Sequence, residues 1–295
     1  MSESYELISR KALMHGPLEA LYCCIGDPVV GNPTQLMIEA AFRDLKYPAR
    51  YLTCTVGTKA LREAIAGIRA LGFAGANVTA PHKVAVMEFL DDLTTSARFS
   101  GAVNCIYNQD GKLVGDNTDG KGFLQSIQEM IPIEGLQVLV LGAGGASRAI
   151  VTELALHGAQ EILIANRTEA KARQIVEALD GKVATRLRAA GLDSGFTIGH
   201  GFDLIVQGTS VGLFSASQML DIHWEKGSHT NQLAADVVFN PVDTAFLQTA
   251  RDAGAATIDG LGMLVNQGAF ALTQWTGKTV SHAIMRKALE IAFSL

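Results

Sequence analysis

The sequence predicts a two-domain α/β protein, and three observations support this prediction. A length of 295 residues is enough for about two domains of ordinary size. Short apolar strands alternate with amphipathic helices, a pattern typical of mostly parallel sheets. The apolar residues 138–141 lead directly into a glycine-rich turn and a helix, as in Rossmann-like domains. We therefore expect an N-terminal α/β domain with a mostly parallel sheet, followed by a Rossmann-like domain.

The first domain, residues 1–121, is expected to contain three strands and a late hairpin. The strands are residues 21–25, 51–54 and 76–79, each a short apolar run. Helices are expected at residues 34–46, with Thr34 as a candidate cap, at 58–71, and from Pro81 to about residue 90. The turn signal Asp110-Gly111 predicts a hairpin between residues 102–107 and 113–115.

The second domain, residues 122–262, is expected to begin with a helix at 122–130 that bridges the two domains. Its predicted strands are residues 138–141, 161–165, 204–207, 234–238 and 256–258. Residues 181–201 are rich in glycine and too weakly patterned to assign. Two apolar helices, 263–275 and 280–293, end the chain without a following strand, so we expect them to pack back on the first domain.

Composition narrows the possible partners and locations. The chain is 48% hydrophobic and 18% charged, as in a globular protein with ample core. A net charge of −5 without a long basic run argues against nucleic acid or an anionic membrane as a partner. No stretch approaches the ~20 uncharged apolar residues of a membrane span, and charged residues interrupt the first twenty positions where a signal peptide would lie. The four cysteines lack metal-ligand spacing, so we expect reduced core thiols, no metal and a cytoplasmic location.

The segment Gly142-Ala143-Gly144-Gly145-Ala146 is a variant of the dinucleotide-binding turn. Its glycines permit a tight turn and let backbone N–H groups approach an anion, and the following helix adds its positive dipole end. Many strand-to-helix turns contain glycines, so this motif alone is weak. Together with two domains, it predicts an interdomain cleft in which the nicotinamide lies.

The end of the next strand indicates which dinucleotide binds. Asn166-Arg167-Thr168 begins 24 residues after Gly142, near the position where a carboxylate would hold the ribose 2′-hydroxyl of NAD. No carboxylate is present, and Lys171 follows one helical turn later. Two cations at this corner favour the 2′-phosphate of NADP. The alternative is an ordinary helix start with a solvated arginine.

Two ionisable residues are candidates for proton transfer. Lys83 follows the strand end Asn77-Val78-Thr79, where an active-site loop is expected, although a solvated lysine at a helix start would have the same local sequence. Asp119 lies at the junction of the domains and could hold a substrate hydroxyl and pair with Lys83. A helix N-cap is the alternative role for this aspartate.

Six motifs occur in an order that closely resembles the shikimate dehydrogenase family, over roughly residues 21–295. Each motif alone is modest evidence, whereas six in register are strong evidence. They are Asn77-Val78-Thr79 with Pro81 and Lys83, Gly101-Ala102-Val103-Asn104, Asn117-Thr118-Asp119-Gly120, the glycine turn at 142–146, Asn166-Arg167-Thr168, and Gly260-Leu261-Gly262-Met263-Leu264 with Gln267.

The resemblance implies an NADP-linked oxidoreductase that interconverts 3-dehydroshikimate and shikimate or a close relative. Lys83 matches the family's catalytic lysine and Asp119 its partner carboxylate. The positions that match hydrogen-bonding partners of the ring hydroxyls are Thr79, Asn104 and Gln267. The positions that match cofactor contacts are the glycine turn (Gly142, Ala143, Gly144, Gly145, Ala146), the 2′-phosphate corner (Asn166, Arg167, Thr168, Lys171) and the nicotinamide side (Val237, Gly260, Met263).

The departures from the family pattern cluster where the family holds the substrate carboxylate. Two family serines are replaced by Asn32 and Thr34, and a family tyrosine by Phe239. Asn32 and Thr34 can still donate hydrogen bonds, whereas Phe239 cannot. A separate departure is Gln207, which precedes Thr209-Ser210 where the family has asparagine.

These departures leave several functions open. The enzyme either takes shikimate held differently, or is a paralogue for quinate, aminoshikimate or a molecule with a different group at that end. A non-catalytic NADP-binding sensor is the alternative from another class, and retention of both Lys83 and Asp119 argues against it. Oxidation of methylene-tetrahydrofolate also pairs a Rossmann domain with a lysine but does not account for the ordered motifs. We expect a monomer or homodimer with a small-molecule substrate.

Overall fold

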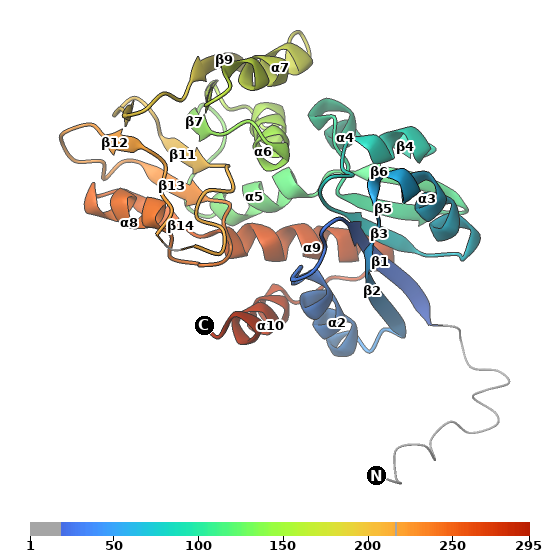
Figure 1. Ribbon diagram of the computed structural model, residues 1–295. Helices are drawn as coiled ribbons and strands as arrows, with labels where there is room; N and C mark the ends of the chain where they lie inside the picture. Colours follow the sequence, from blue (N-terminus) through green and yellow to red (C-terminus); the bar gives the residue numbers. More distant parts are fainter. Residues whose placement is uncertain (1–18, 216) are drawn as a thin grey trace, which may run out of the picture.

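The computed structural model describes residues 19–215 and 217–295, which form two α/β lobes side by side (Figure 1). Each lobe is built on a six-stranded sheet, as the alternation of strands and helices predicts. The expectation for residues 1–18, including the missing signal-peptide pattern, lies outside the described residues. No helix in the described ranges is long and apolar enough to cross a membrane.

The sheet of the first lobe has the strand order β2-β1-β3-β5-β6-β4. Strand β1 pairs in parallel with β2 and β3, whereas the hairpin β5–β6 is antiparallel and pairs with β3. Parallel pairing of β1 and β3 brings their carboxyl ends to one edge, from which the loop to α2 and the loop that carries Lys83 leave. The elements of this lobe are β1 (Ala20–Gly26), α2 (Thr34–Asp44), β2 (Ala49–Thr55), η1 (Thr58–Ala60), α3 (Leu61–Ala70), β3 (Gly75–Val78), η2 (Ala85–Phe89), β4 (Asp92–Leu93), α4 (Thr95–Ser100), β5 (Cys105–Gln109) and β6 (Lys112–Asp116).

The sheet of the second lobe is parallel throughout, in the order β14-β13-β11-β7-β8-β9. Strand β7 is central and fully apolar over Val138, Leu139, Val140 and Leu141, all buried, so the glycine turn leaves from the middle of the sheet. The elements are β7 (Gln137–Leu141), α6 (Gly145–Leu156), β8 (Glu161–Asn166), α7 (Glu169–Leu179), β9 (Arg186–Gly191), β10 (Phe196–Ile198), β11 (Leu204–Gln207), β12 (Ile222–Trp224), β13 (Leu233–Asp236), α8 (Ala245–Asp252) and β14 (Ala256–Ile258).

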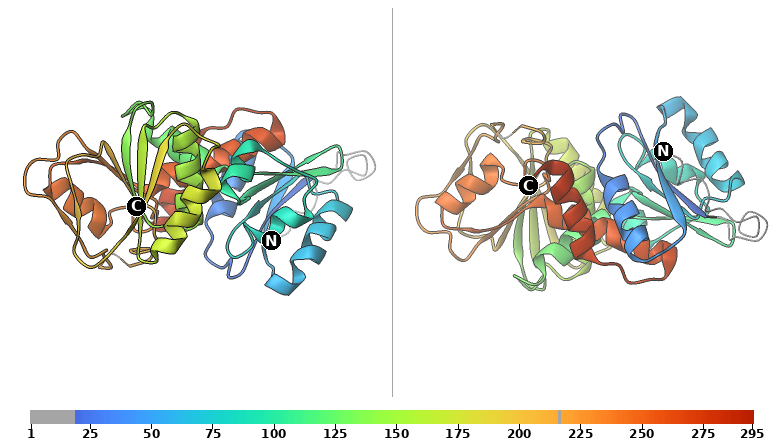
Figure 2. Two further views of the ribbon diagram at one scale, coloured as in Figure 1. Left: turned by 90° about the horizontal axis from the view of Figure 1, so that it is seen from above. Right: turned by 90° about the horizontal axis from the view of Figure 1, so that it is seen from below.

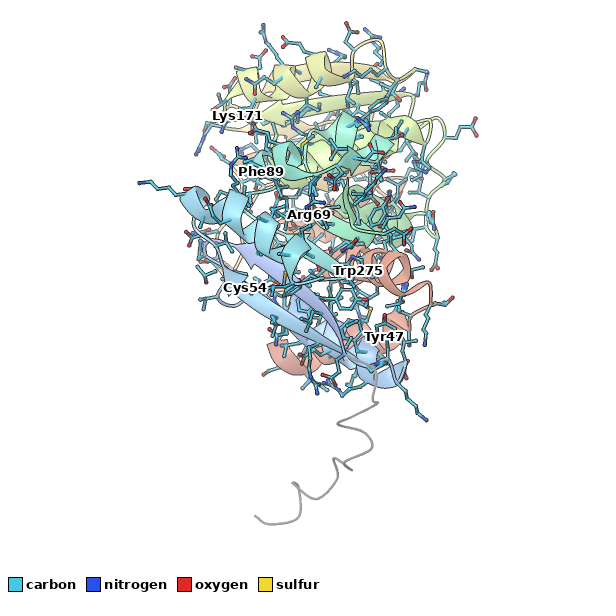
Figure 3. All side chains as sticks on the ribbon, turned by 90° about the vertical axis from the view of Figure 1, so that its right-hand side faces the viewer. Tyr47, Cys54, Arg69, Phe89, Lys171 and Trp275 are labelled. Atoms are coloured by element: carbon cyan, nitrogen blue, oxygen red, sulfur yellow. The ribbon has the colours of Figure 1, made fainter. Side chains whose placement is uncertain are left out.

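Three helices connect the lobes: α5 (Asp119–Ile127), α9 (Gly260–Thr276) and α10 (His282–Phe293). Helix α9 extends from the second lobe to the first, and α10 lies near the junction (Figure 1 and Figure 2). Apolar side chains of α9 and α10 pack with Tyr22, Met37 and Tyr51 of the first lobe in one buried cluster. Trp275 near the end of α9 donates from Nε1 to the Ile106 carbonyl at 2.9 Å, and Figure 3 shows it against the first lobe. Both terminal helices therefore share a buried apolar cluster with the first lobe.

Three sequence-based expectations about elements are wrong. Residues 81–90 form a turn and the short 3₁₀ helix η2, not an α-helix. The Lys83 carbonyl accepts from Val103 N at 2.7 Å and is therefore not available for an α-helical hydrogen bond. Thr34 does not cap α2; Pro33 is the N-cap, and the Thr34 N–H donates to Asn32 Oδ1 at 2.9 Å. The first hairpin strand begins later than expected, since residues 102–104 precede β5, whereas β6 begins one residue earlier than expected, at Lys112.

Several further segments were not predicted, among them β12 and α8. Strand β4 and helix α4 went unassigned, although Thr94 caps α4 by accepting from Ala97 N at 3.3 Å. Residues 181–201, left open, contain β9 at the sheet edge and the short β10.

Candidate active site

A cavity of about 360 Å³ lies between the lobes and receives side chains from both. The first lobe contributes the loop after β1 and the strand end of β3, and the second contributes the loops after β11 and β13 together with the start of α9. Its lining contains all predicted substrate positions and both predicted proton-transfer residues, namely Asn32, Thr34, Thr79, Lys83, Asn104, Asp119, Phe239 and Gln267.

Lys83 and Asp119 form an ion pair in this cavity, with Nζ 2.5 Å from Oδ2. The pair is largely shielded, since the side chains are 26% and 11% exposed, respectively. Asp119 is the first residue of α5, where the positive end of the helix dipole favours a carboxylate, and Thr118 rather than Asp119 is the N-cap. The arrangement is therefore neither a solvated lysine nor a capping aspartate, the two alternatives that the sequence left open.

The turn that presents Lys83 is anchored on both sides. His82 is 1% exposed and donates from Nε2 to the Val56 carbonyl at 2.5 Å. The Lys83 carbonyl accepts from Val103 N at 2.7 Å. Fixing the backbone at two points reduces the conformational freedom that the lysine would lose when it binds a reacting group.

Asn104 orients the carboxylate of Asp119. It is 3% exposed, and its Nδ2 donates to Asp119 Oδ1 at 2.7 Å and lies 3.4 Å from Gln267 Oε1. Its Oδ1 accepts from Thr118 N at 2.7 Å, which fixes the direction of the amide. One carboxylate oxygen thus faces Asn104 and the other faces Lys83, so the pair is held in one geometry.

Thr79 and its neighbour Asn77 line the same side of the cavity. Asn77 Oδ1 accepts from the buried Tyr51 hydroxyl at 2.6 Å, and its Nδ2 lies 3.3 Å from the Asn104 carbonyl. The sequence motifs do not assign a role to Asn77, although its place near the carboxyl end of a strand indicates a site residue. The lining residues Leu213 and Phe214 were also missed, because they lie in an irregular loop without a local signature.

The glycine turn between β7 and α6 has the features of a phosphate-binding turn. Gly142 adopts φ 110°, which favours glycine, and a side chain there would meet Thr209 Cγ2 at 2.8 Å. Gly144 is the N-cap of α6 and makes no side-chain cap bond, so the first N–H groups of α6 are free to bind an anion. Ala143 and Ala146 flank this turn, and Ala146 also lines the cavity. These residues fit the pyrophosphate of a dinucleotide.

The corner at the end of β8 fits an adenosine 2′-phosphate. Asn166 Nδ2 donates to the Thr168 carbonyl at 2.8 Å, and Thr168 is the N-cap of α7 without a side-chain cap bond. Arg167 and Lys171 are exposed here. The nearby carboxylate of Glu169 lies 2.6 Å from Arg173 and is paired away from the corner. The local charge is therefore positive.

Three predicted nicotinamide contacts, Val237, Gly260 and Met263, line the cavity across from the first lobe. Their backbone is organised by Asp236, which is 2% exposed. Asp236 accepts from Thr244 Oγ1 at 2.6 Å, from Val238 N at 2.9 Å and from Gln207 Nε2 at 3.1 Å. Burial outweighs these hydrogen bonds and raises the pKa of Asp236 to about 6.

Gln207, which departs from the family pattern, ties the neighbouring loop to Asp236. Its Oε1 accepts from Thr209 N at 2.6 Å and its Nε2 also donates to the Val211 carbonyl at 3.0 Å. The glutamine therefore organises the loop after β11.

The fold and the site define a class: a two-domain, dinucleotide-dependent oxidoreductase whose lysine–carboxylate pair lies in the cleft between a substrate lobe and a Rossmann-like lobe. Family models match the chain over residues 24–106 (shikimate dehydrogenase substrate binding domain), 125–243 (shikimate / quinate 5-dehydrogenase) and 260–290 (shikimate 5′-dehydrogenase C-terminal domain). The chain belongs to the shikimate dehydrogenase family.

Individual relatives show where this chain stands within the family. It is 40% identical over 263 residues to the shikimate dehydrogenase (NADP(+)) of Geobacillus kaustophilus, covering 88% of this chain and 94% of the relative. The 5-ketofructose reductase of Gluconobacter sp. strain CHM43, solved ligand-free, is 41% identical to this chain with a TM-score of 0.89. The superposition covers 93% of this chain and 99% of the reductase chain. Shikimate 5-dehydrogenase of Thermus thermophilus, solved with NADP(H) and shikimate, is 31% identical to this chain with a TM-score of 0.80. This superposition covers 92% of this chain and 99% of the Thermus chain.

The raised pKa of Asp236 predicts a pH-dependent stability. The folded protein retains a proton that the unfolded chain releases at about pH 4, so the stabilisation is complete below about pH 4 and is lost as pH rises through about 6. Asp236→Asn removes this loss. The measured quantity is the free energy of unfolding of the variant minus that of wild type, obtained with urea at each pH. This difference should rise by on the order of 1–3 kcal/mol from about pH 4 to about pH 7.

Asp243→Asn is the control for this measurement. Asp243 is exposed and its pKa is lowered, first by a hydrogen bond from Arg251, so its substitution should shift the difference slightly in the opposite direction. A difference between wild type and Asp236→Asn that stays constant across this pH range would contradict the assignment.

Proposed function

We propose that this protein is an NADP-dependent oxidoreductase that interconverts 3-dehydroshikimate and shikimate or a closely related cyclic polyol acid. The observation that carries the proposal is the Lys83–Asp119 pair, 2.5 Å apart in a cavity whose other wall is the nicotinamide side of a Rossmann-like lobe. Names and bound ligands of the relatives support NADP and shikimate as cofactor and substrate.

Lys83 is proposed to carry the proton of the reacting hydroxyl. The bound dinucleotide supplies the hydride acceptor or donor. In the direction of alcohol oxidation, the amine form of Lys83 takes up the hydroxyl proton as the carbon–hydrogen bond breaks and becomes the ammonium; in reduction, the ammonium donates this proton to the carbonyl oxygen and returns to the amine. Asp119 holds the ammonium in place and accepts a hydrogen bond from the substrate, while Asn104 keeps the carboxylate turned toward the cavity.

The remaining site assignments belong to the same proposal. Thr79, Asn104 and Gln267 bind ring hydroxyls, and residues 1–121 form the substrate-binding domain, with helices 263–295 packed against it. Residues 122–262 form the NADP domain, in which Gly142–Ala146 bind the pyrophosphate. The adenosine 2′-phosphate is held by Asn166, Arg167, Thr168 and Lys171. We place the protein in the cytoplasm, as a monomer or homodimer.

A second candidate is the reduction of an uncharged polyhydroxy ketone, as the name of the Gluconobacter 5-ketofructose reductase describes. One observation of this chain favours it: Phe239 and Asn32 occupy the cavity where the family pattern has hydroxyl side chains for a carboxylate. A quinate- or aminoshikimate-type paralogue and a non-catalytic NADP sensor are the remaining outcomes of the test below.

Lys83→Ala should lower kcat for the preferred substrate by at least about 10²–10⁴-fold, the usual contribution of a general acid–base. NADP affinity should be unchanged, because Lys83 lies on the substrate lobe. Initial rates with shikimate, quinate and aminoshikimate, each with NAD and NADP, identify the activity, and fluorescence titration measures NADP binding. Lys59→Ala, an exposed lysine outside the cavity, is the control. Turnover by Lys83→Ala at the wild-type rate would refute the role of Lys83, and tight NADP binding without any turnover by the wild type would favour the sensor.

Arg167→Ala combined with Lys171→Ala should weaken NADP binding by about 10–100-fold and leave NAD binding nearly unchanged, because only NADP carries the 2′-phosphate that these cations face. Dissociation constants for the two cofactors give the ratio. Lys182→Ala removes an exposed lysine beyond the far end of α7, so it should leave the ratio as in wild type. An equal loss for NAD and NADP would show that the corner does not discriminate between them.

A further inference from the structure

The cavity, as the described residues line it, offers no unpaired cation to an anionic substrate. Among these lining residues Lys83 is the single basic side chain, and Asp119 already neutralises it at 2.5 Å. Cys24 also lines the cavity, and burial raises the pKa of its thiol to about 11, so it is neutral at physiological pH. A carboxylate that enters this space must therefore be satisfied by neutral donors.

Neutral donors are scarce on the loop that leads into α2. Asn32 uses its Oδ1 to accept from Thr34 N at 2.9 Å, and its Nδ2 lies 3.7 Å from Cys24 Sγ. The amide orientation is thus fixed, and among the side chains of this loop only Asn32 Nδ2, which also faces Cys24 Sγ, and the Thr34 hydroxyl can donate. An ionised carboxylate has about four acceptor sites, whereas a substrate hydroxyl needs only about one or two partners.

The facing wall of the cavity is aromatic. Phe214 and Phe239 both line it, with ring centroids 6.2 Å apart and an edge-to-face angle of 87°. Phe239 also stacks on Phe293 of α10 at 6.0 Å, so its ring is supported from behind by the last helix of the chain. Such a wall supplies apolar surface and no hydrogen bond.

The rim of the cavity is apolar on both lobes as well. Val30 on the first lobe is 91% exposed and Phe214 on the second is 66% exposed, and both line the cavity. The Phe214 N–H donates to the Asn240 carbonyl at 2.7 Å, and this hydrogen bond fixes the loop that carries the Phe214 side chain at the rim of the cavity. Exposed apolar groups on both sides of an opening favour a bound molecule that covers them without bringing a charge.

We propose that this part of the cavity recognises an uncharged end of the substrate, so that the preferred substrate is a polyhydroxylated alcohol or ketone without a carboxylate. Asn32, Phe214 and Phe239 are then the residues that determine specificity, whereas Lys83 and Asp119 perform the reaction at the other functional group. The inference rests on the proposed NADP-linked oxidoreductase function, and among its substrate classes it favours the second candidate, an uncharged polyhydroxy compound, over the cyclic acid.

Shikimate and its methyl ester test this inference, because they share the ring and hydroxyls and differ in the charge. With wild-type protein and saturating NADP, kcat/KM should be about ten- to a hundredfold higher for the ester, the factor expected when a buried charge lacks partners. Calorimetric titration of the NADPH-bound protein, which cannot oxidise either alcohol, should show the same preference in affinity and separates binding from turnover.

A triple variant with Phe239→Tyr, Asn32→Ser and Thr34→Ser should raise kcat/KM for shikimate about ten- to a hundredfold and leave that for the ester unchanged or lower. Phe270→Tyr adds the same hydroxyl on an exposed face of α9, outside the cavity, and should change neither value.

The outcomes separate the inference from the function on which it rests. If wild type uses shikimate as well as or better than the ester, or if the triple variant leaves both values unaltered, the inference is overturned and the proposed oxidoreductase function stands. If neither compound is oxidised with NADP and neither binds, the proposed function fails and the inference fails with it.

Discussion

The ion pair between Lys83 and Asp119 is the constraint on which the rest of the site depends. The two residues lie 36 positions apart in sequence, one on a turn after β3 and the other at the start of α5, and they meet only because the sheet and the bridging helix are correctly placed. A buried lysine without a carboxylate would be costly, and a buried carboxylate without a cation equally so. Asn104 completes the arrangement by bonding the second carboxylate oxygen.

Three helices begin at the cavity and give it its electrostatic character. Helix α5 starts with Asp119, α6 starts after the glycine turn, and α9 starts at Gly260 behind the capping carboxylate of Asp259. Two of these helices can approach closely because Gly120 has no side chain; a Cβ there would lie 2.3 Å from the Ala149 carbonyl oxygen. This close packing of α5 on α6 relates the proton-transfer pair to the phosphate-binding turn. The neutral, aromatic part of the cavity is then free to vary with the substrate.

Much of the fold could be predicted from the sequence because its strands are short apolar runs bounded by turn residues, as in β1, β7 and the β5–β6 hairpin. The prediction failed where tertiary hydrogen bonds compete with local ones, as for the Lys83 carbonyl, and where an edge strand such as β9 carries alternating arginines and little apolar signal. In the site, motifs identified Lys83, Asp119 and Asn104, whose side chains meet in space. Phe214 was not found, since its place in the cavity follows from a loop conformation that has no local signature.

A crystal structure of the protein with NADP⁺ and the substrate of higher kcat/KM tests the central claim most directly. Our account requires the reacting hydroxyl within about 2.6–3.2 Å of Lys83 Nζ, with its carbon facing C4 of the nicotinamide across the interdomain cavity. A substrate whose hydroxyl lies beyond the reach of Lys83, or a nicotinamide bound away from Val237 and Met263, would contradict it.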